Sequence, residues 1–286
     1  MTQPLYARPD TIEEAVSLLS DGRWRLLAGG TDFYPAQGNR PIRDNILDLN
    51  GIAALRGIEP TAQGIRIGAR TTWTDTVRAD LPPAFDGLRL AAREVGSVQI
   101  QNTGTVAGNL CNASPAADGV PPLLTLDASV ELRSATGARV LPLADFILGN
   151  RRTALRPGEL VTAVLIPSAA MAGRSTFLKL GARRYLVISI AMVAARLAVE
   201  NGRVRQAAIA IGSCSEVAKR LTELEADLVG RNADMSLADT VQDRHLTGLS
   251  PIDDVRASAV YRREAAHEIV ARAIAQLAGT AQDIAA

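Results

Sequence analysis

The sequence predicts an α+β fold in two parts, and three observations support this prediction. Helical periodicity and strand-like alternation follow each other closely in the N-terminal part. Residues 175–211 then predict a meander of three antiparallel strands, and the remainder of the chain predicts helices. The small, turn-prone segment 167–173 lies between the two parts and is the best candidate for a linker.

The N-terminal part begins with a predicted helix at 10–20, because Asp10 or Thr11 can cap it and the following apolar residues share one helical stripe. Two more helices are expected at 71–80 and 86–95. The predicted strands lie at 25–28, 45–49, 64–68, 123–132, 140–146 and 158–167, and a proline ends the last of them.

The C-terminal part contains the three strands of the predicted sheet and a predicted three-helix bundle. The strands are expected at 175–179, 188–199 and 204–211, and Asn201-Gly202 is a typical hairpin turn between the last two. The helices are expected at about 216–229, 236–242 and 255–278.

The composition is that of an ordinary globular protein and excludes several functions. A net charge of +1 over 286 residues creates no strong positive electrostatic field that would attract nucleic acid or an anionic membrane surface. We expect no membrane span and no signal peptide, and therefore a cytoplasmic location. The two cysteines, Cys111 and Cys214, provide neither a disulfide framework nor the four ligands of an iron–sulfur cluster.

The first of two glycine-rich loops comprises Leu27, Ala28, Gly29, Gly30, Thr31 and Asp32, and it follows a predicted strand. Paired glycines let backbone N–H groups turn outward and form a concave nest for an anion. An ordinary tight turn is the alternative interpretation.

The second loop is a stretch of small and polar residues at 104–118, part of a Gly-, Asn- and Ser-rich segment that starts at 96. Small residues admit a flat ligand, Asn109 can orient its polar groups, and Asp118 can accept hydrogen bonds from a ribose. An Asx-rich surface loop is the alternative. Neither loop matches the Rossmann or the P-loop fingerprint, which disfavours those two folds.

Together the two loops resemble the FAD-binding signatures of the medium subunits of molybdenum hydroxylases, the family of xanthine dehydrogenase and carbon monoxide dehydrogenase. The matching motifs are A-G-G-T-D at residues 28–32 and T-V-A-G-N-x-x-N-A-S-P-x-x-D at 105–118. The R-A-S-A-x-Y-R-R segment at 256–263 resembles the family's terminal helix. One departure is Ala107, which stands where the family usually has a glycine.

The resemblance implies a fold and a cofactor site. It implies non-covalent FAD between two α+β subdomains of the vanillyl-alcohol-oxidase type, at 1–60 and 61–168, followed by a C-terminal domain at 174–286. It places the first loop, from Leu27 to Asp32, around the pyrophosphate, with Thr105, Gly108 and Asn109 on the other side of it. It places Cys111 and Asp118 near the adenosine half, Val161 near the flavin and Lys179 near the isoalloxazine ring. Lys179 is one of only two lysines in an arginine-rich chain, which favours a chemical role.

The implied function is electron transfer. A large subunit would hold the molybdenum cofactor, a small subunit two [2Fe–2S] clusters, and this chain would pass electrons through FAD to an acceptor such as NAD. A dimer of heterotrimers is expected, with no catalytic acid or base and no metal in this chain. His245 and His267 are expected to have packing or surface roles. The alternatives are a stand-alone FAD-dependent reductase or oxidase and a flavin-free assembly module.

Overall fold

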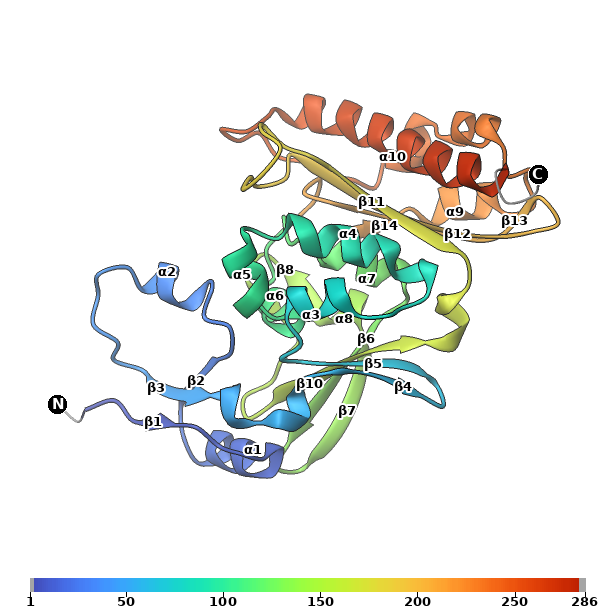
Figure 1. Cartoon of the computed structure of the whole chain (residues 1–286). Helices are drawn as coiled ribbons and strands as arrows, with labels where there is room; N and C mark the ends of the chain where they lie inside the picture. Colours follow the sequence, from blue (N-terminus) through green and yellow to red (C-terminus); the bar gives the residue numbers. More distant parts are fainter. Residues whose placement is uncertain (1–2, 283–286) are drawn as a thin grey trace.

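Residues 3–282 of the computed structural model are described, and they form three sheets of three or more strands, with helices between and around them (Figure 1). The first sheet is parallel, in the order β1-β3-β2. The chain enters α1 from Thr11, whose hydroxyl accepts a hydrogen bond from the Glu14 amide at 3.1 Å. This first unit comprises β1 (Tyr6–Ala7), α1 (Ile12–Asp21), β2 (Trp24–Leu27), α2 (Phe33–Gln37), β3 (Asn45–Asp48), η1 (Leu49–Gly51) and η2 (Ala53–Leu55).

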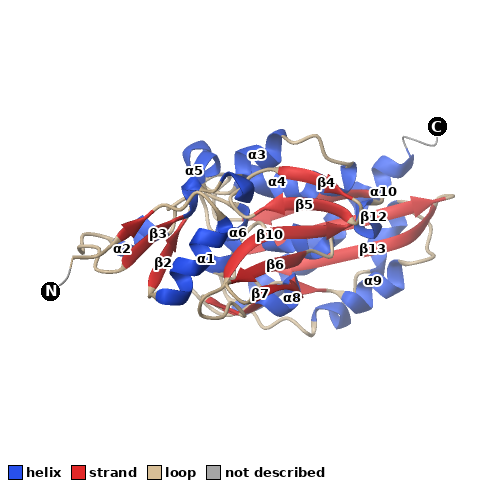
Figure 2. Ribbon diagram, turned by 90° about the horizontal axis from the view of Figure 1, so that it is seen from below, coloured by secondary structure: helices blue, strands red, loops and turns tan. Residues whose placement is uncertain are grey.

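The second sheet is antiparallel and has five strands in the order β4-β5-β10-β6-β7. Figure 2 shows these strands side by side, with β2 and β3 of the first sheet near one end. The strands are β4 (Ile58–Thr61), β5 (Gly64–Gly68), β6 (Ser129–Ser134), β7 (Gly137–Pro142) and β10 (Leu160–Pro167). A two-stranded sheet of β8 (Ile147–Gly149) and β9 (Arg152–Thr153) follows β7 in the chain.

The helices of this second unit lie between β5 and β8 in the sequence. They are α3 (Trp73–Arg78), η3 (Pro83–Phe85), α4 (Asp86–Glu94), α5 (Val98–Thr103), α6 (Val106–Asn112), α7 (Val120–Thr125) and α8 (Leu143–Phe146). One continuous hydrophobic core runs through the first two units, from Val16 on α1 to Phe85 and Leu123 among these helices.

The C-terminal domain follows η4 (Ser168–Met171) and consists of an antiparallel sheet with helices. The sheet is β11 (Arg174–Leu180), β12 (Ala191–Glu200), β13 (Arg203–Gly212) and β14 (Lys219–Arg220), and the helices are α9 (Thr222–Leu228), η5 (Met235–Thr240), η6 (Asp243–Leu246) and α10 (Ala259–Gln282). Helix α10 covers one face of this sheet, and α4 and α7 of the second unit contact the other (Figure 1). A small cluster that includes Ala91, Phe177 and Met192 fills the seam.

The α+β fold class is confirmed, but several elements differ from the sequence prediction. The C-terminal sheet has four strands instead of three, because Lys219–Arg220 adds to the edge of β13. The middle segment of the helical bundle is 3₁₀ helix, not α-helix. Residues 123–125, expected in a strand, belong to helix α7, because Pro121 and Pro122 fit the first turn of a helix and short buried apolar runs do not reveal their type.

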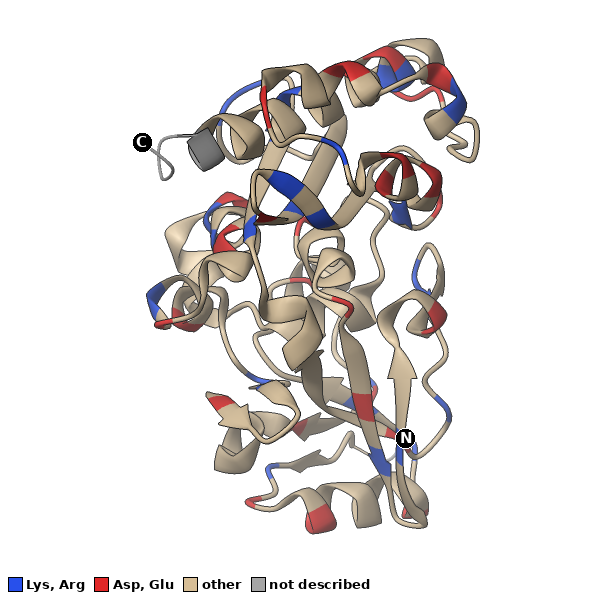
Figure 3. Ribbon diagram, turned by 90° about the vertical axis from the view of Figure 1, so that its right-hand side faces the viewer, with Lys and Arg blue, Asp and Glu red and all other residues tan. Residues whose placement is uncertain are grey.

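The surface carries both charges, interspersed over the elements (Figure 3). This distribution agrees with the net charge of +1. Within residues 3–282, no helix is both long enough and apolar enough to cross a membrane.

Candidate flavin site

A cavity of about 610 Å³ is lined by the first loop, by α6, by the ends of α4 and α5, and by β10. Its size is typical of a site for a small organic ligand or cofactor. The lining includes residues from both α+β units. Leu26 and Gly30 belong to the first unit, and Val161, more than a hundred positions later in the chain, belongs to the second.

The first loop has a shape that only glycine permits. Gly30 has φ +71°, and a Cβ there would lie 2.7 Å from the Tyr34 ring. A Cβ on Gly29 would lie 2.0 Å from the carbonyl oxygen of Thr103, the last residue of α5. The two glycines therefore allow the first loop to turn and to pack directly against the chain that leads into the second loop.

The amides of Gly29, Gly30 and Thr31 donate no hydrogen bond to any residue among 3–282. The loop carbonyls, in contrast, are engaged: Ala28 accepts from Asn50 at 2.9 Å and Gly30 from the Tyr34 amide at 3.1 Å. Successive unengaged N–H groups at a cavity wall are the donors that a diphosphate requires. This observation favours the anion nest over an ordinary turn.

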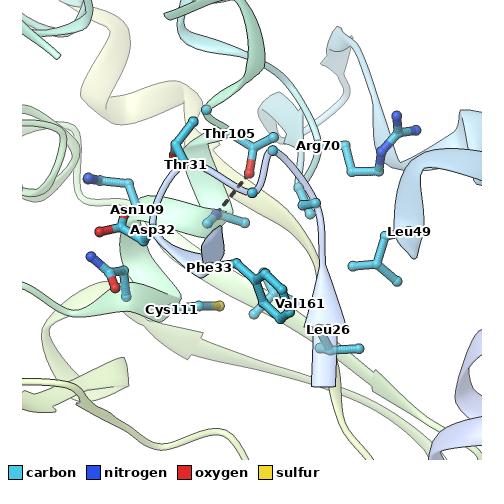
Figure 4. A pocket seen from close by; sticks show the side chains of 18 of the residues that line it. Leu26, Thr31, Asp32, Phe33, Leu49, Arg70, Thr105, Asn109, Cys111 and Val161 are labelled. Atoms are coloured by element: carbon cyan, nitrogen blue, oxygen red, sulfur yellow. Dashed lines mark hydrogen bonds between the residues drawn. The ribbon is translucent and has the colours of Figure 1, made fainter. Parts of the chain in front are cut away.

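The second loop contains helix α6, which covers seven of its fifteen residues, so it is not one continuous irregular loop. Thr105 caps α6, and its Oγ1 accepts from the Gly108 amide at 3.1 Å (Figure 4). Ala107 lies within α6, and its amide donates to Ala69 at 3.3 Å. Its backbone is helical, so alanine in place of the family's glycine carries no penalty for positive φ.

Asn109 provides a direct test of whether the cavity fits a polar cofactor. Its Oδ1 is buried and has no hydrogen-bond partner among the described residues. A buried, unpaired oxygen is costly, and native proteins rarely leave one without a functional reason. An unpaired acceptor, unengaged amides and a glycine cradle together fit a dinucleotide such as FAD, which has both donors and phosphates.

Three arginines line the cavity, and sequence reasoning missed all of them. Arg25 contacts Asp44 at 3.3 Å and stacks on the Phe33 ring at 4.4 Å. Arg70 projects from the end of β5, and Arg151 hydrogen-bonds Asn112 at the rim. Because Asp32 is the one carboxylate in the lining that the structure describes, the site is electropositive and suits an anion.

Apolar side chains supply the rest of the wall, where a planar ring can pack. Sequence reasoning found only Val161 among them. The others include Leu26, Phe33, Leu49, Trp73, Val95, Ile100, Leu155 and Leu160. Figure 4 labels Leu26, Phe33 and Leu49. No local motif marks these residues, since they come from separate elements spread from residue 26 to residue 160.

Of the thirteen residues expected at the site, ten line this cavity. They are Ala28, Gly29, Gly30, Thr31, Asp32, Thr105, Gly108, Asn109, Cys111 and Val161. Leu27 is the last residue of β2; it is buried and does not line the cavity.

Asp118 and Lys179 do not line the cavity either; they pair with each other. Lys179 Nζ lies 2.7 Å from Asp118 Oδ2, and Ser189 Oγ donates to Asp118 Oδ1 at 2.9 Å. Lys179 also lies 3.5 Å from the carbonyl of Glu94, the residue before Val95 in the cavity wall. Their contact with FAD stays a prediction.

The histidines and Cys214 lie away from the cavity. His245 is buried against Asp227, at 3.1 Å, and Gln242. His267 lies on α10, and neither histidine lines the cavity. Cys214 is buried in the C-terminal core, where burial raises the pKa of its thiol to about 11, whereas Cys111 is a free, exposed thiol in the cavity wall.

Comparisons with known proteins agree with this geometry. Residues 1–169 match the family described as the FAD binding domain in molybdopterin dehydrogenase, and residues 176–277 match the CO dehydrogenase flavoprotein C-terminal domain. The glyceraldehyde dehydrogenase medium chain of Sulfolobus acidocaldarius is 30% identical, over 96% of this chain and 98% of the relative.

Two further proteins cover the whole length. The xanthine dehydrogenase FAD-binding subunit of Escherichia coli O157:H7 is 28% identical over 97% of this chain and 98% of its own. A chain of the reconstituted CO dehydrogenase from Oligotropha carboxidovorans superimposes with a TM-score of 0.88 at 28% identity, covering 98% of this chain and 99% of that one.

The fold and the site therefore define an FAD-binding protein with two α+β units and a C-terminal flavoprotein domain. The chain belongs to the family of FAD-binding medium subunits of molybdenum hydroxylases, the oxidoreductases that include xanthine dehydrogenase and carbon monoxide dehydrogenase.

Proposed function

We propose that this chain is the electron-transferring FAD subunit of a heterotrimeric molybdenum hydroxylase, and that it occurs in a dimer of heterotrimers. The observation that carries the proposal is the cavity between the two glycine-bearing segments, with unengaged amides on one wall and the unpaired Asn109 oxygen on another. When FAD is bound, it supplies the redox chemistry, accepting electrons from a donor and passing them to an acceptor.

The chain's own residues bind and orient. Amides of Gly29 to Thr31 donate to the diphosphate, Asn109 accepts from a donor of the cofactor, and apolar residues such as Phe33 and Val161 exclude water from its rings. Among the described residues of the lining, Asp32 is the one carboxylate and no histidine is present.

The partners and the acceptor complete the proposal. A large subunit carries the molybdenum cofactor and hydroxylates the substrate, and a small subunit with two [2Fe–2S] clusters delivers electrons to FAD. NAD is the proposed terminal acceptor. The cofactor is held without a covalent bond, and neither histidine lies in the cavity wall to act as a tether.

The test compares the isolated chain with a co-expressed complex of the three proposed subunits. A panel of aldehydes, heterocycles and aromatic CoA thioesters should bleach the flavin absorbance in the complex and leave the isolated chain yellow. Turnover by the isolated chain at about 1–10³ per second would instead identify a stand-alone flavoenzyme. A chain that binds its partners without flavin would identify an assembly module.

Two further measurements address attachment and acceptor. Acid precipitation should release FAD, not FMN, into the supernatant, and a yellow pellet would contradict non-covalent binding. In an anaerobic cuvette, NAD⁺ should restore the absorbance of the dithionite-reduced complex. If a quinone restores it and NAD⁺ does not, the acceptor is different and the subunit assignment stands.

A further inference from the structure

Arg70 is a charged residue in the wall of the flavin cavity that no glycine loop or family motif includes. Two of its three guanidinium nitrogens are occupied: NH1 donates to the Ile52 carbonyl at 2.8 Å, and NH2 donates to Asn50 Oδ1 at 3.0 Å. The third, Nε, is buried and has no hydrogen-bond partner among the described residues. A charged donor with one unpaired, dehydrated N–H group is a costly arrangement without a ligand.

The same contacts connect Arg70 to the first loop. Asn50 accepts from Arg70 and donates through Nδ2 to the Ala28 carbonyl at 2.9 Å and to Asp48 Oδ1 at 2.7 Å. Asp48 is buried and also accepts from the Tyr6 hydroxyl at 2.6 Å. These contacts hold the guanidinium in one orientation. The side chain of Asn50 bridges it to the Ala28 carbonyl in the first loop.

Among residues 3–282, no carboxylate forms an ion pair with Arg70. The carboxylate of Asp48 acts on it only at longer range, and burial lowers the pKa of Arg70, although arginine remains protonated at neutral pH. Arg66 lies on β5, four residues before Arg70, and differs in this respect: its guanidinium pairs with Glu131 at 3.1 Å. A fixed, unpaired positive charge at the cavity wall attracts an anionic ligand.

We propose that Arg70 is a cofactor-binding residue, whose guanidinium, held in orientation by Asn50, donates to the diphosphate of FAD. The inference rests on FAD as the cofactor of this cavity. The first loop alone offers the diphosphate only neutral amides. Arg70 adds a positively charged partner.

The test is equilibrium binding to the deflavinated full-length chain. Wild type, Arg70→Gln and Arg70→Lys are titrated with FAD, with ADP, which contains the diphosphate, and with riboflavin, which contains no phosphate. Arg70→Gln should weaken FAD and ADP by about tenfold or more, as expected for loss of a charge-assisted hydrogen bond, and leave riboflavin within about twofold. Arg70→Lys keeps the charge without the fixed guanidinium, so it should lose less FAD affinity than Arg70→Gln.

Arg66→Gln is the matched control, because it removes a paired arginine four residues before Arg70, and it should bind all three ligands as wild type does. Thermal melts without ligand distinguish a loss of stability from a loss of affinity. If Arg70→Gln does not fold, the comparison is made with Arg70→Lys. Unchanged FAD affinity in a folded Arg70 variant would overturn the proposal, as would an equal loss for riboflavin. Failure of the wild type to bind FAD would instead overturn the cofactor assignment itself.

Discussion

Lys179 Nζ lies 2.7 Å from the carboxylate of Asp118, and the two side chains are only 7% and 10% exposed. The pair joins β11 of the C-terminal domain to the segment between α6 and α7. Burial raises the pKa of Asp118, while the ammonium of Lys179 and the hydroxyl of Ser189 oppose this effect. The pair therefore links the C-terminal domain to the second α+β unit.

Removing one partner of this pair should destabilise the fold strongly. We expect Lys179→Met to lower the free energy of unfolding by about 3–5 kcal/mol, because it leaves a buried carboxyl group without its counter-ion. Lys179→Met combined with Asp118→Leu should recover part of the loss. Urea unfolding measures both, and Lys219→Met, at the chain's other lysine, should cost less than about 1 kcal/mol. Equal effects at the two lysines would show that the pair adds no stability.

Gly30→Val should abolish FAD binding while the fold persists. The branched Cβ would meet the Tyr34 ring at 2.7 Å in a backbone with φ +71°. The loop must move, and its amides leave the diphosphate. Flavin absorbance per chain, together with circular dichroism, measures the outcome. Gly202→Val is the control, since Gly202 has φ +70° with no atom within 4 Å of its Cβ and lies in the distant β12–β13 turn. Full flavin occupancy in Gly30→Val would reduce the first loop to a simple turn.

Asn109→Leu should affect binding and stability in different directions. Loss of the Oδ1 acceptor should weaken FAD by about tenfold, which corresponds to one buried hydrogen bond. Without FAD, the variant should be as stable as wild type or more stable, because a buried unpaired oxygen has been removed. Isothermal titration and urea unfolding measure the two effects. Asn102→Leu, at an exposed residue that bonds Thr74, should leave FAD affinity unchanged. A destabilised Asn109→Leu with normal FAD affinity would contradict the assignment.

Glu159 should contribute to the acid sensitivity of the fold. Its carboxylate is 8% exposed and accepts two hydrogen bonds of 2.7 Å from Arg139. Arg139 lowers the pKa of Glu159, burial opposes this, and the Arg156 amide lowers it further. Since the folded pKa is depressed, the stabilisation is complete above the unfolded pKa of about 4.3 and is lost as the pH falls through the folded pKa.

Glu159→Gln should therefore be less stable than wild type at pH 7, and the difference should shrink as the pH falls below about 4. Urea unfolding at several pH values between about 4 and 7 measures the difference in the free energy of unfolding between the variant and wild type. The control is Glu200→Gln, because Glu200 and its partner Arg205 are both largely exposed, and its difference from wild type should be small at every pH. A difference for Glu159→Gln that does not change with pH would contradict the role of its charge.

The sequence alone determined the parts of this protein that depend on local chemistry. Paired glycines at 29 and 30 require a backbone that other residues resist, so the first loop is visible in the sequence. The alternation at 64–68 predicts β5, and Asn201-Gly202 predicts the hairpin between β12 and β13, because both signals act within a few residues.

Only the tertiary structure decided which distant residues meet. Arg70 and Asn50 come together with Ala28 through contacts between separate elements, and the pairing of Lys179 with Asp118 depends on how the C-terminal sheet packs on α4 and α7. The apolar run at 120–125 could equally have been a strand, and its burial against β12 and β13 accompanies its helical form. Hydrophobic burial is not directional, so the sequence specifies that such segments are inside but not which neighbours they contact.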